Sequence, residues 1–141
     1  MRASILENPM QRITLIMILL NAFATPVMLS SVNVAIPFIA NDLSVNAVLL
    51  CWIPMAYLMA SAMFVLIFGR IADMVGRKKI FLIGTTSVIV TSLIAASVDS
   101  GIALIVTRFL QGVSAAMLYA TQLAIISSIF PPAKRGYAIG L

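Results

Sequence analysis

Four apolar stretches, each long enough to cross a lipid bilayer as a helix, constrain the fold of this chain more than any other feature. A spanning helix needs about 20 mostly apolar residues. The chain is 62% hydrophobic and 9% charged, whereas about 25% of the residues of a soluble domain are charged. The sequence therefore predicts an all-α membrane protein with four transmembrane helices and little room for a soluble domain. The expected helices cover residues 13–40, 48–68, 80–98 and 102–130.

Both ends of the chain carry further signals. Pro131 and Pro132 stop the fourth helix, and residues 136–141 turn apolar again, so we expect them to begin a fifth helix at which the chain is cut short. At the N-terminus, basic residues, an apolar run and the small-residue pattern Ala22-Phe23-Ala24 also suit a cleaved signal peptide. The apolar character continues well beyond Ala24, which favours a spanning helix.

The basic residues between the helices fall on one side of the predicted membrane. Eight of the nine Lys and Arg residues lie on the cytoplasmic side if the N-terminus is cytoplasmic, and the outer connections near Asp42 and Asp99 contain none. Cytoplasmic loops carry such an excess of basic residues. We therefore predict a multi-pass protein of the cell membrane with a cytoplasmic N-terminus. The eight residues are Arg2, Arg12, Arg70, Arg77, Lys78, Lys79, Lys134 and Arg135.

Several classes of function are disfavoured by what the chain contains. The net charge is +5, but the basic residues are neither interleaved with aromatic residues nor set on one face, so we expect no nucleic-acid partner. The chain has no His and one Cys, which argues against a metal site, and we expect no cofactor. No Ser/His, Cys/His or paired carboxylate is available at membrane depth. We therefore do not expect an enzyme.

Charge is concentrated in residues 69–80, GRIADMVGRKKI, between the second and third predicted helices. Topology requires only Lys and Arg, so it leaves Gly69, Asp73 and Gly76 unexplained. Asp73 precedes Arg77 by four residues, a spacing at which opposite charges meet on a helical turn, and glycines permit tight turns. A topology signal and a specific structural role both remain open for this segment.

The fourth predicted helix carries a charged residue well inside the membrane. Arg108 lies about seven residues into the span, where its insertion costs at least ~2.5 kcal/mol. One face of the helix, at 100° per residue, comprises Arg108, Gln111, Ala115, Tyr119 and Gln122. This face predicts a polar lining of a pathway, whereas the alternative is a structural arginine bonded to carbonyls of a neighbouring helix. A neighbouring all-small stripe, which lets another helix pack closely, comprises Gly112, Ala116, Ala120 and Ala124.

The first predicted helix contributes uncharged polar groups. Asn21 and Thr25 share one face, and they could hydrogen-bond across a cavity or to a neighbouring helix. No Asp or Glu lies deep in any of the four spans. We therefore expect Arg108 to point toward the first helix, near Asn21, Thr25 or Met28, without a carboxylate neighbour.

Two motifs resemble those of major facilitator transporters. Residues 69–79, GRIADMVGRKK, resemble the pattern G-x-L-A-D-x-x-G-R-K/R-x between helices two and three of that family. Residues 108–116, RFLQGVSAA, resemble R-x-x-Q-G-x-G-A-A of its fourth helix, with Ser114 in place of a glycine. The segments SSVNVAIP (30–37) and WIPMAYL (52–58) are similar to the fourteen-helix drug:proton antiporter branch. The resemblance covers essentially the whole chain and implies the first four helices of an N-terminal bundle.

The resemblance also implies roles for individual residues. In the family, the segment between helices two and three latches two helical bundles in the outward-open state, which implies gating roles for Gly69, Arg70, Asp73, Gly76 and Arg77, supported by Lys78 and Lys79. The arginine of the fourth helix is implicated in proton coupling in the antiporters, so Arg108 and Gln111 inherit a cavity role. The branch has an Asp five residues before the position of Asn33, where this chain has Met28. A carboxylate that exchanges protons would then come from a missing helix.

The sequence thus predicts a fragment of a transporter that exports a drug or metabolite by alternating access. Its partners are the lipid bilayer, a small-molecule substrate, the missing C-terminal helices and, if transport is proton-coupled, protons. A four-helix multidrug carrier that works as a dimer fits poorly, because that class relies on a glutamate in its first helix and none exists here. The remaining alternative is a non-transporting membrane scaffold or assembly subunit, which would not explain both Arg108 with Gln111 and the charged segment.

Overall fold

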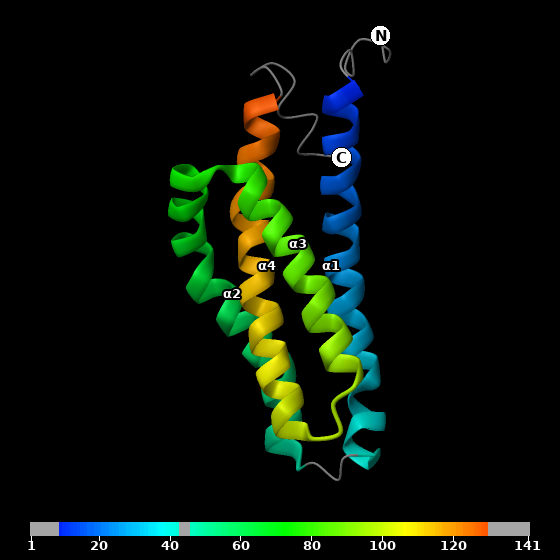
Figure 1. Cartoon of the computed structure of the whole chain (residues 1–141). Coiled ribbons are helices and arrows are strands. Elements are labelled where there is room, and N and C mark those ends of the chain that lie inside the picture. The colour runs from blue at the N-terminus through cyan, green and yellow to red at the C-terminus, as the bar shows by residue number, and fades with distance from the viewer. Residues whose placement is uncertain (1–8, 43–45, 130–141) are drawn as a thin grey trace.

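The computed structural model of the protein describes residues 9–42 and 46–129 as a bundle of helices (Figure 1). Its elements are α1 (Pro9–Asp42), α2 (Ala47–Val75), α3 (Arg77–Ala96) and α4 (Gly101–Ile129). Each of the four contains a stretch that is long and apolar enough to cross a membrane, and no strand occurs among these described residues. The prediction of an all-α membrane protein with four transmembrane helices is confirmed. The expected start of a fifth helix at 136–141 lies outside the described residues.

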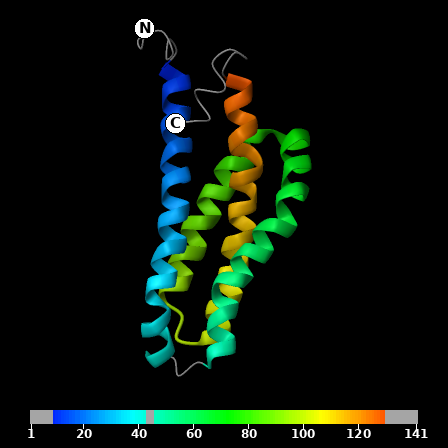
Figure 2. The same ribbon diagram turned by 180° about the vertical axis from the view of Figure 1, so that it is seen from behind.

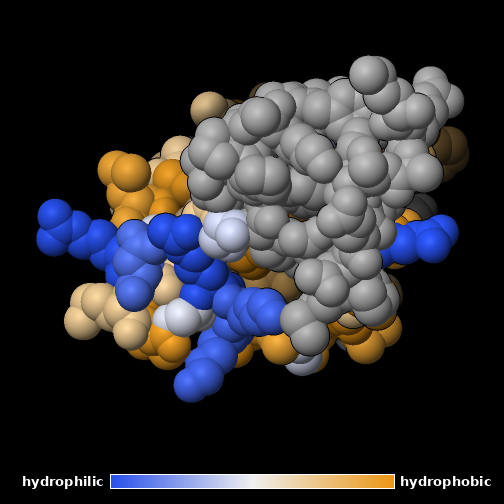
Figure 3. Space-filling model, turned by 90° about the horizontal axis from the view of Figure 1, so that it is seen from above, coloured by the Kyte–Doolittle hydropathy of each residue, from blue (hydrophilic) through white to orange (hydrophobic). Residues whose placement is uncertain are grey.

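The helices alternate in direction along the bundle. The first residues of α1, the junction between α2 and α3 and the last residues of α4 lie at the same end in both views (Figures 1 and 2). Seen from above, hydrophilic side chains gather at this end (Figure 3). We call it the basic end, because it contains Arg12, Arg70, Arg77, Lys78 and Lys79. This arrangement agrees with the excess of Lys and Arg that membrane proteins carry in the loops on the cytoplasmic side.

The helix α4 is the best buried of the four. Half of its apolar window is buried, compared with 17–28% in the windows of the other helices. It contributes to two apolar clusters. The first cluster joins α1, α3 and α4 and contains Leu15, Ile18, Phe81, Leu118 and Ile125. The second joins α1, α2 and α4 and contains Val32, Ile53 and Leu104. The site residues of α4 are therefore held from three sides.

Small side chains allow α2 and α4 to approach closely. A Cβ atom added at Gly112 would collide with the carbonyl oxygen of Tyr57 and lie 2.8 Å from the Cβ atom of Ala60. Of the stripe predicted for helix packing, Gly112 lies at this contact and Ala116 is completely buried. The other two members, Ala120 and Ala124, are half-buried. Only glycine fits where the backbone of one helix meets that of another so closely.

The structure corrects the expected boundary between the second and third helices. Residues 69–80 are not a loop: α2 continues to Val75, seven residues beyond the predicted end, and α3 begins at Arg77. Gly76 alone separates them, with a φ of 113° that L-residues rarely adopt. Gly69 lies inside α2 and makes no turn. Hydropathy marks where the membrane ends, whereas a helix continues into water as long as its residues favour it.

Candidate functional site

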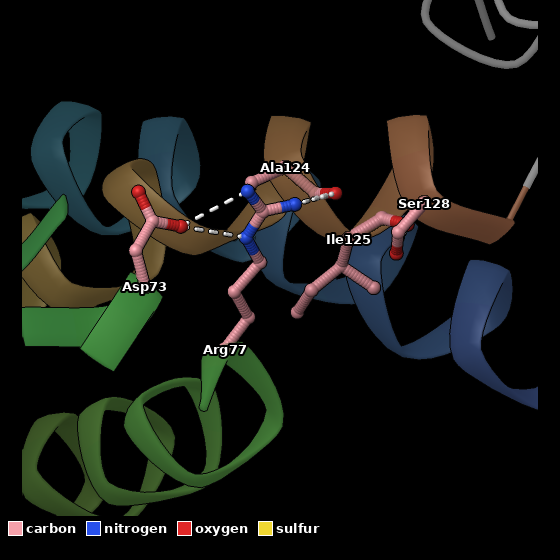
Figure 4. A network of polar contacts seen from close by, with 5 residues as sticks. All are labelled: Asp73, Arg77, Ala124, Ile125 and Ser128. Atoms are coloured by element: carbon pink, nitrogen blue, oxygen red, sulfur yellow. Dashed lines mark hydrogen bonds and ion pairs between the residues drawn. The ribbon is translucent and has the colours of Figure 1, made fainter. Parts of the chain in front are cut away.

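One guanidinium joins three helices at the basic end. From the first residue of α3, Arg77 Nη2 lies 2.9 Å from Asp73 Oδ1 on α2, and Nε donates to the same oxygen at 3.0 Å. Arg77 Nη1 donates to the carbonyl oxygen of Ala124 on α4 at 3.0 Å (Figure 4). Arginine suits this position because its planar fork presents several donors in fixed directions. The ends of α2, α3 and α4 are thereby tied together.

A cavity of about 510 Å³ lies beside this guanidinium. Ile125 and Ser128 of α4 lie next to Arg77 (Figure 4), and 62% of the Asp73 side chain is exposed. The cavity is lined by Ala72, Asp73, Gly76, Arg77, Lys78, Ile125 and Ser128. The structure therefore brings together Asp73, Gly76 and Arg77 of the predicted gating residues. The other two do not line this cavity: Gly69 is half-buried within α2, and Arg70 is exposed.

A polar network lies within the apolar part of the bundle. Arg108 Nη1 donates to Gln111 Oε1 at 2.9 Å, and Gln111 Nε2 donates to Ser92 Oγ on α3 at 2.9 Å. The sulfur of Met28 on α1 lies 4.0 Å from Gln111 Nε2 and 3.9 Å from Ser92 Oγ. Only 2% of Gln111 is exposed. The network connects α4 with α3 and ends at the helix toward which Arg108 was predicted to point.

A hollow of about 270 Å³ opens beside the network, and we call it the Arg108 hollow. It is lined by Met28, Ser92, Ala95, Ala96, Arg108 and Gln111. Arg108 Nε is buried and has no hydrogen-bond partner in the described part of the chain. The recorded bond of the guanidinium goes to Gln111 of its own helix and not to a carbonyl of a neighbouring one. The hollow thus presents a cation, an amide and a hydroxyl beside a thioether.

The polar groups of α1 line a second, smaller cavity of about 50 Å³. Asn21 Nδ2 donates to the carbonyl of Met17 at 3.0 Å, and Thr25 Oγ1 donates to the carbonyl of Asn21 at 2.8 Å. Both side chains therefore bond to their own helix, which neither predicted alternative included. At about 30 Å³ for each water molecule, this cavity has room for one or two. Met28 lines both this cavity and the Arg108 hollow.

The remaining polar residues of α4 lie apart from the Arg108 hollow. The hydroxyl oxygens of Tyr119 and Tyr57 are 3.3 Å apart, with Tyr57 only 1% exposed and Tyr119 38% exposed. Gln122 Nε2 is buried without a hydrogen-bond partner among residues 9–42 and 46–129. The predicted face of α4 is therefore divided into two groups.

Sequence reasoning did not select Ser92 or Tyr57 as site residues. Tyr57 lies in the quoted WIPMAYL segment, and its polar hydroxyl in an apolar span was a signal that could have identified it. No spacing or motif distinguishes Ser92, because its role depends on Gln111 of another helix.

Comparison with known proteins finds similarity to membrane transporters. Residues 18–141 match the Major Facilitator Superfamily. The riboflavin transporter RibZ of Clostridioides difficile is 33% identical over 129 residues, which are 92% of this chain and 28% of the relative. The puromycin resistance protein pur8 of Streptomyces alboniger is 36% identical over 111 residues, 78% of this chain and 22% of the relative. The multidrug resistance protein Stp of Mycobacterium tuberculosis is 35% identical over 136 residues, which are 95% of this chain and 25% of the relative.

The chain spans about a quarter of the length of these curated relatives. No solved structure shows a significant match to the chain. The match to the superfamily covers most of the sequence and all four helices in whole or in part. The chain therefore belongs to the Major Facilitator Superfamily.

Proposed function

We propose that this chain forms the first four helices of a carrier that exports a small molecule by alternating access. The observation that carries the proposal is the Arg108–Gln111–Ser92 network beside a hollow in an otherwise apolar bundle. Charged groups at membrane depth are costly and are found where a substrate or ion pathway needs them. The resistance and transporter names of the relatives support export of a drug or metabolite. The protein is a carrier in the bilayer and not an enzyme.

In this proposal, helices beyond the described residues complete the pathway. Alternating access in this fold occurs by rocking of two helical halves around a central site. The 510 Å³ cavity at the basic end, with the exposed Asp73 carboxylate at its wall, has room for a side chain or helix end of the second half. Asp73, Gly76 and Arg77 would then hold one state of the cycle. Gly69 and Arg70 would act only through the end of α2.

Proton coupling needs a group that gains and loses a proton during the transport cycle. Arg108 stays protonated in proteins and cannot exchange a proton during a cycle, and Met28 replaces the acid expected on α1. If protons drive export, the exchanging carboxylate belongs to a helix outside this chain. The alternative, a scaffold without transport, does not explain why a costly charged residue lines a hollow within the membrane span.

An export assay tests the function. The protein is expressed from its complete reading frame in a bacterial strain that lacks its own efflux pumps, and accumulation of labelled puromycin and riboflavin is measured. Arg108→Ala is expected to abolish export, and Arg108→Lys to restore little, because lysine lacks the planar fork of donors. Val106→Ala is the control, since Val106 lies on the exposed side of the same helix. Export by Arg108→Ala equal to the wild type contradicts the proposal, and a scaffold predicts no export by any variant.

The gating proposal has its own test in the same assay. Asp73→Asn leaves the count of basic residues unchanged but removes the ion pair with Arg77. We expect normal amounts of protein in the membrane and impaired export. Full export by this variant would reduce residues 69–80 to a topology signal.

We also propose that the protein lies in the cell membrane with its N-terminus in the cytoplasm. The basic end then faces the cytoplasm. Reporter fusions test this orientation. A reporter active only outside the cytoplasm should work after Asp42 or Asp99, and one active only in the cytoplasm should work after Lys79 or Arg135. The reverse pattern at two or more of these sites would overturn the orientation.

A further inference from the structure

The charge of Arg108 is not balanced by the described helices. A guanidinium remains a cation at any pH that proteins meet. Asp73 is paired with Arg77 at the basic end, and no ion pair joins Arg108 to a carboxylate whose side chain the structure describes. Arg108 lies about 10 Å along α4 from Gly101, at 1.5 Å per residue. A partly buried cation at this depth is stable only with polar or charged partners.

The donors at the Arg108 hollow fit a planar anion. Arg108 lines the hollow, and among residues 9–42 and 46–129 its guanidinium makes a hydrogen bond only through Nη1, to Gln111; Nε lies buried behind this edge without a partner. A guanidinium pairs best with a carboxylate, which accepts two parallel hydrogen bonds from it. Ala95 and Ala96 form part of the wall, and these small side chains leave a hollow of about 270 Å³. At about 30 Å³ for each water molecule, it has room for several.

We propose that the Arg108 hollow binds a carboxylate group of the transported molecule, so that the substrate supplies the anion that Met28 does not. The proposal rests on the carrier function and names the substrate class of its site. A single cation balances a single negative charge, which favours a carboxylate over a doubly charged phosphate. The sulfur and methyl groups of Met28 offer an adaptable apolar wall for the rest of the molecule.

Met28 provides a precise way to test this assignment. Its sulfur lies within 4.0 Å of Gln111 Nε2 and lines the same hollow as Arg108. An aspartate at this position would place a carboxylate of the chain itself in the hollow, where it would compete with that of the substrate. Asparagine has the same shape without the charge. The difference between Met28→Asp and Met28→Asn therefore measures the effect of the charge alone.

Binding of three ring compounds of similar shape provides the assay. The protein, expressed from its complete reading frame, is placed in nanodiscs of neutral phosphatidylcholine, so that anionic lipid does not occupy the hollow. Benzoate, benzamide and benzamidinium are titrated and followed by ligand-observed nuclear magnetic resonance, with empty nanodiscs as the blank. We expect benzoate to bind about tenfold more tightly than the neutral and cationic probes, as a close charge pair predicts.

The variants distinguish a charge effect from general damage. Arg108→Gln should remove the preference for benzoate, whereas the same change at Arg12, exposed at the basic end, should not. Met28→Asp should bind benzoate about tenfold more weakly than Met28→Asn. Equal binding of benzoate and benzamide by the wild type, or equal benzoate binding by the two Met28 variants, overturns the proposal. If Arg108→Gln fails to fold, the Met28 pair still decides.

The binding and export assays fail independently. Export of puromycin or riboflavin without binding of benzoate would leave the carrier function intact and refute the carboxylate site. Binding of benzoate that depends on Arg108, in a protein that exports neither puromycin, riboflavin nor labelled benzoate, would retain the site and refute the carrier.

Discussion

Replacing Gly112 by alanine is expected to loosen the contact between α2 and α4. The added methyl group would collide with the carbonyl oxygen of Tyr57 and lie 2.8 Å from the Cβ atom of Ala60, where ordinary contacts begin near 3.4 Å. A backbone carbonyl within a helix cannot rotate away as a flexible side chain can. The two helices must therefore move apart by about half an ångström or more, and a gap of 0.5–1 Å forfeits about a quarter to a half of each dispersion contact.

The size of the effect follows from this geometry. Extra carbon in a well-packed interface costs about 1–3 kcal/mol. Gly69→Ala is the matched control, because Gly69 also lies inside a helix but a Cβ atom there would meet nothing within 4 Å. Alanine is the better helix former by about 1 kcal/mol. This gain applies at both positions, so the difference between the two variants is the packing cost alone, about 1–3 kcal/mol, with Gly112→Ala the less stable.

The free energy of unfolding gives the comparison. Purified variants in mild detergent are titrated with sodium dodecyl sulfate, and the loss of helical circular dichroism is followed. Gly112→Ala should unfold at a lower fraction of denaturing detergent than the wild type, and Gly69→Ala at the same or a higher fraction. The close-contact reasoning is refuted if Gly112→Ala is as stable as Gly69→Ala.

Two further changes test other features in the same titration. Gly76→Ala forces an L-residue to a φ of 113° and should cost about 1–3 kcal/mol; no loss of stability would show that the junction relaxes freely. Tyr119→Phe leaves the buried hydroxyl of Tyr57 without its partner and should cost about 1–3 kcal/mol. Tyr57→Phe removes the buried hydroxyl itself and leaves only the hydroxyl of Tyr119, which is 38% exposed, without its partner, so it should cost about 1 kcal/mol or less. The reverse order would contradict the assignment of the buried partner.

Four helices could be predicted from the sequence because each depends on local composition. An apolar run of about 20 residues has few stable alternatives in a bilayer. The end of α2 could not be predicted in this way, since charged residues after Phe68 signal the membrane surface while the helix continues to Val75. The single residue that does end it, Gly76, could be recognised as a turn-forming residue. Gly69, seven residues earlier, could be taken for a turn-forming residue on the same grounds, yet it lies within the helix.

The candidate site was predictable to the extent that its contacts are local. Arg108 and Gln111 are three residues apart on one helix, so their hydrogen bond follows from spacing. Ser92 belongs to another helix, and its bond to Gln111 depends on the rotation of α3 about its own axis, which no local pattern sets. The same applies to Tyr57, whose partner Tyr119 is 62 residues away. Contacts between helices require the packed structure.

The three-helix contact of Arg77 also sets an order of assembly during synthesis. Asp73 precedes Arg77 by four residues, so their ion pair can form as soon as this junction has been made. The carbonyl of Ala124 comes 47 residues later. At the usual pace of about 5–20 residues per second, it arrives about 2–10 s after Arg77. During this interval Nη1 of Arg77 is solvated by water at the membrane surface, and its transfer to the carbonyl of α4 completes the attachment of the newest helix to a hairpin that was already in place.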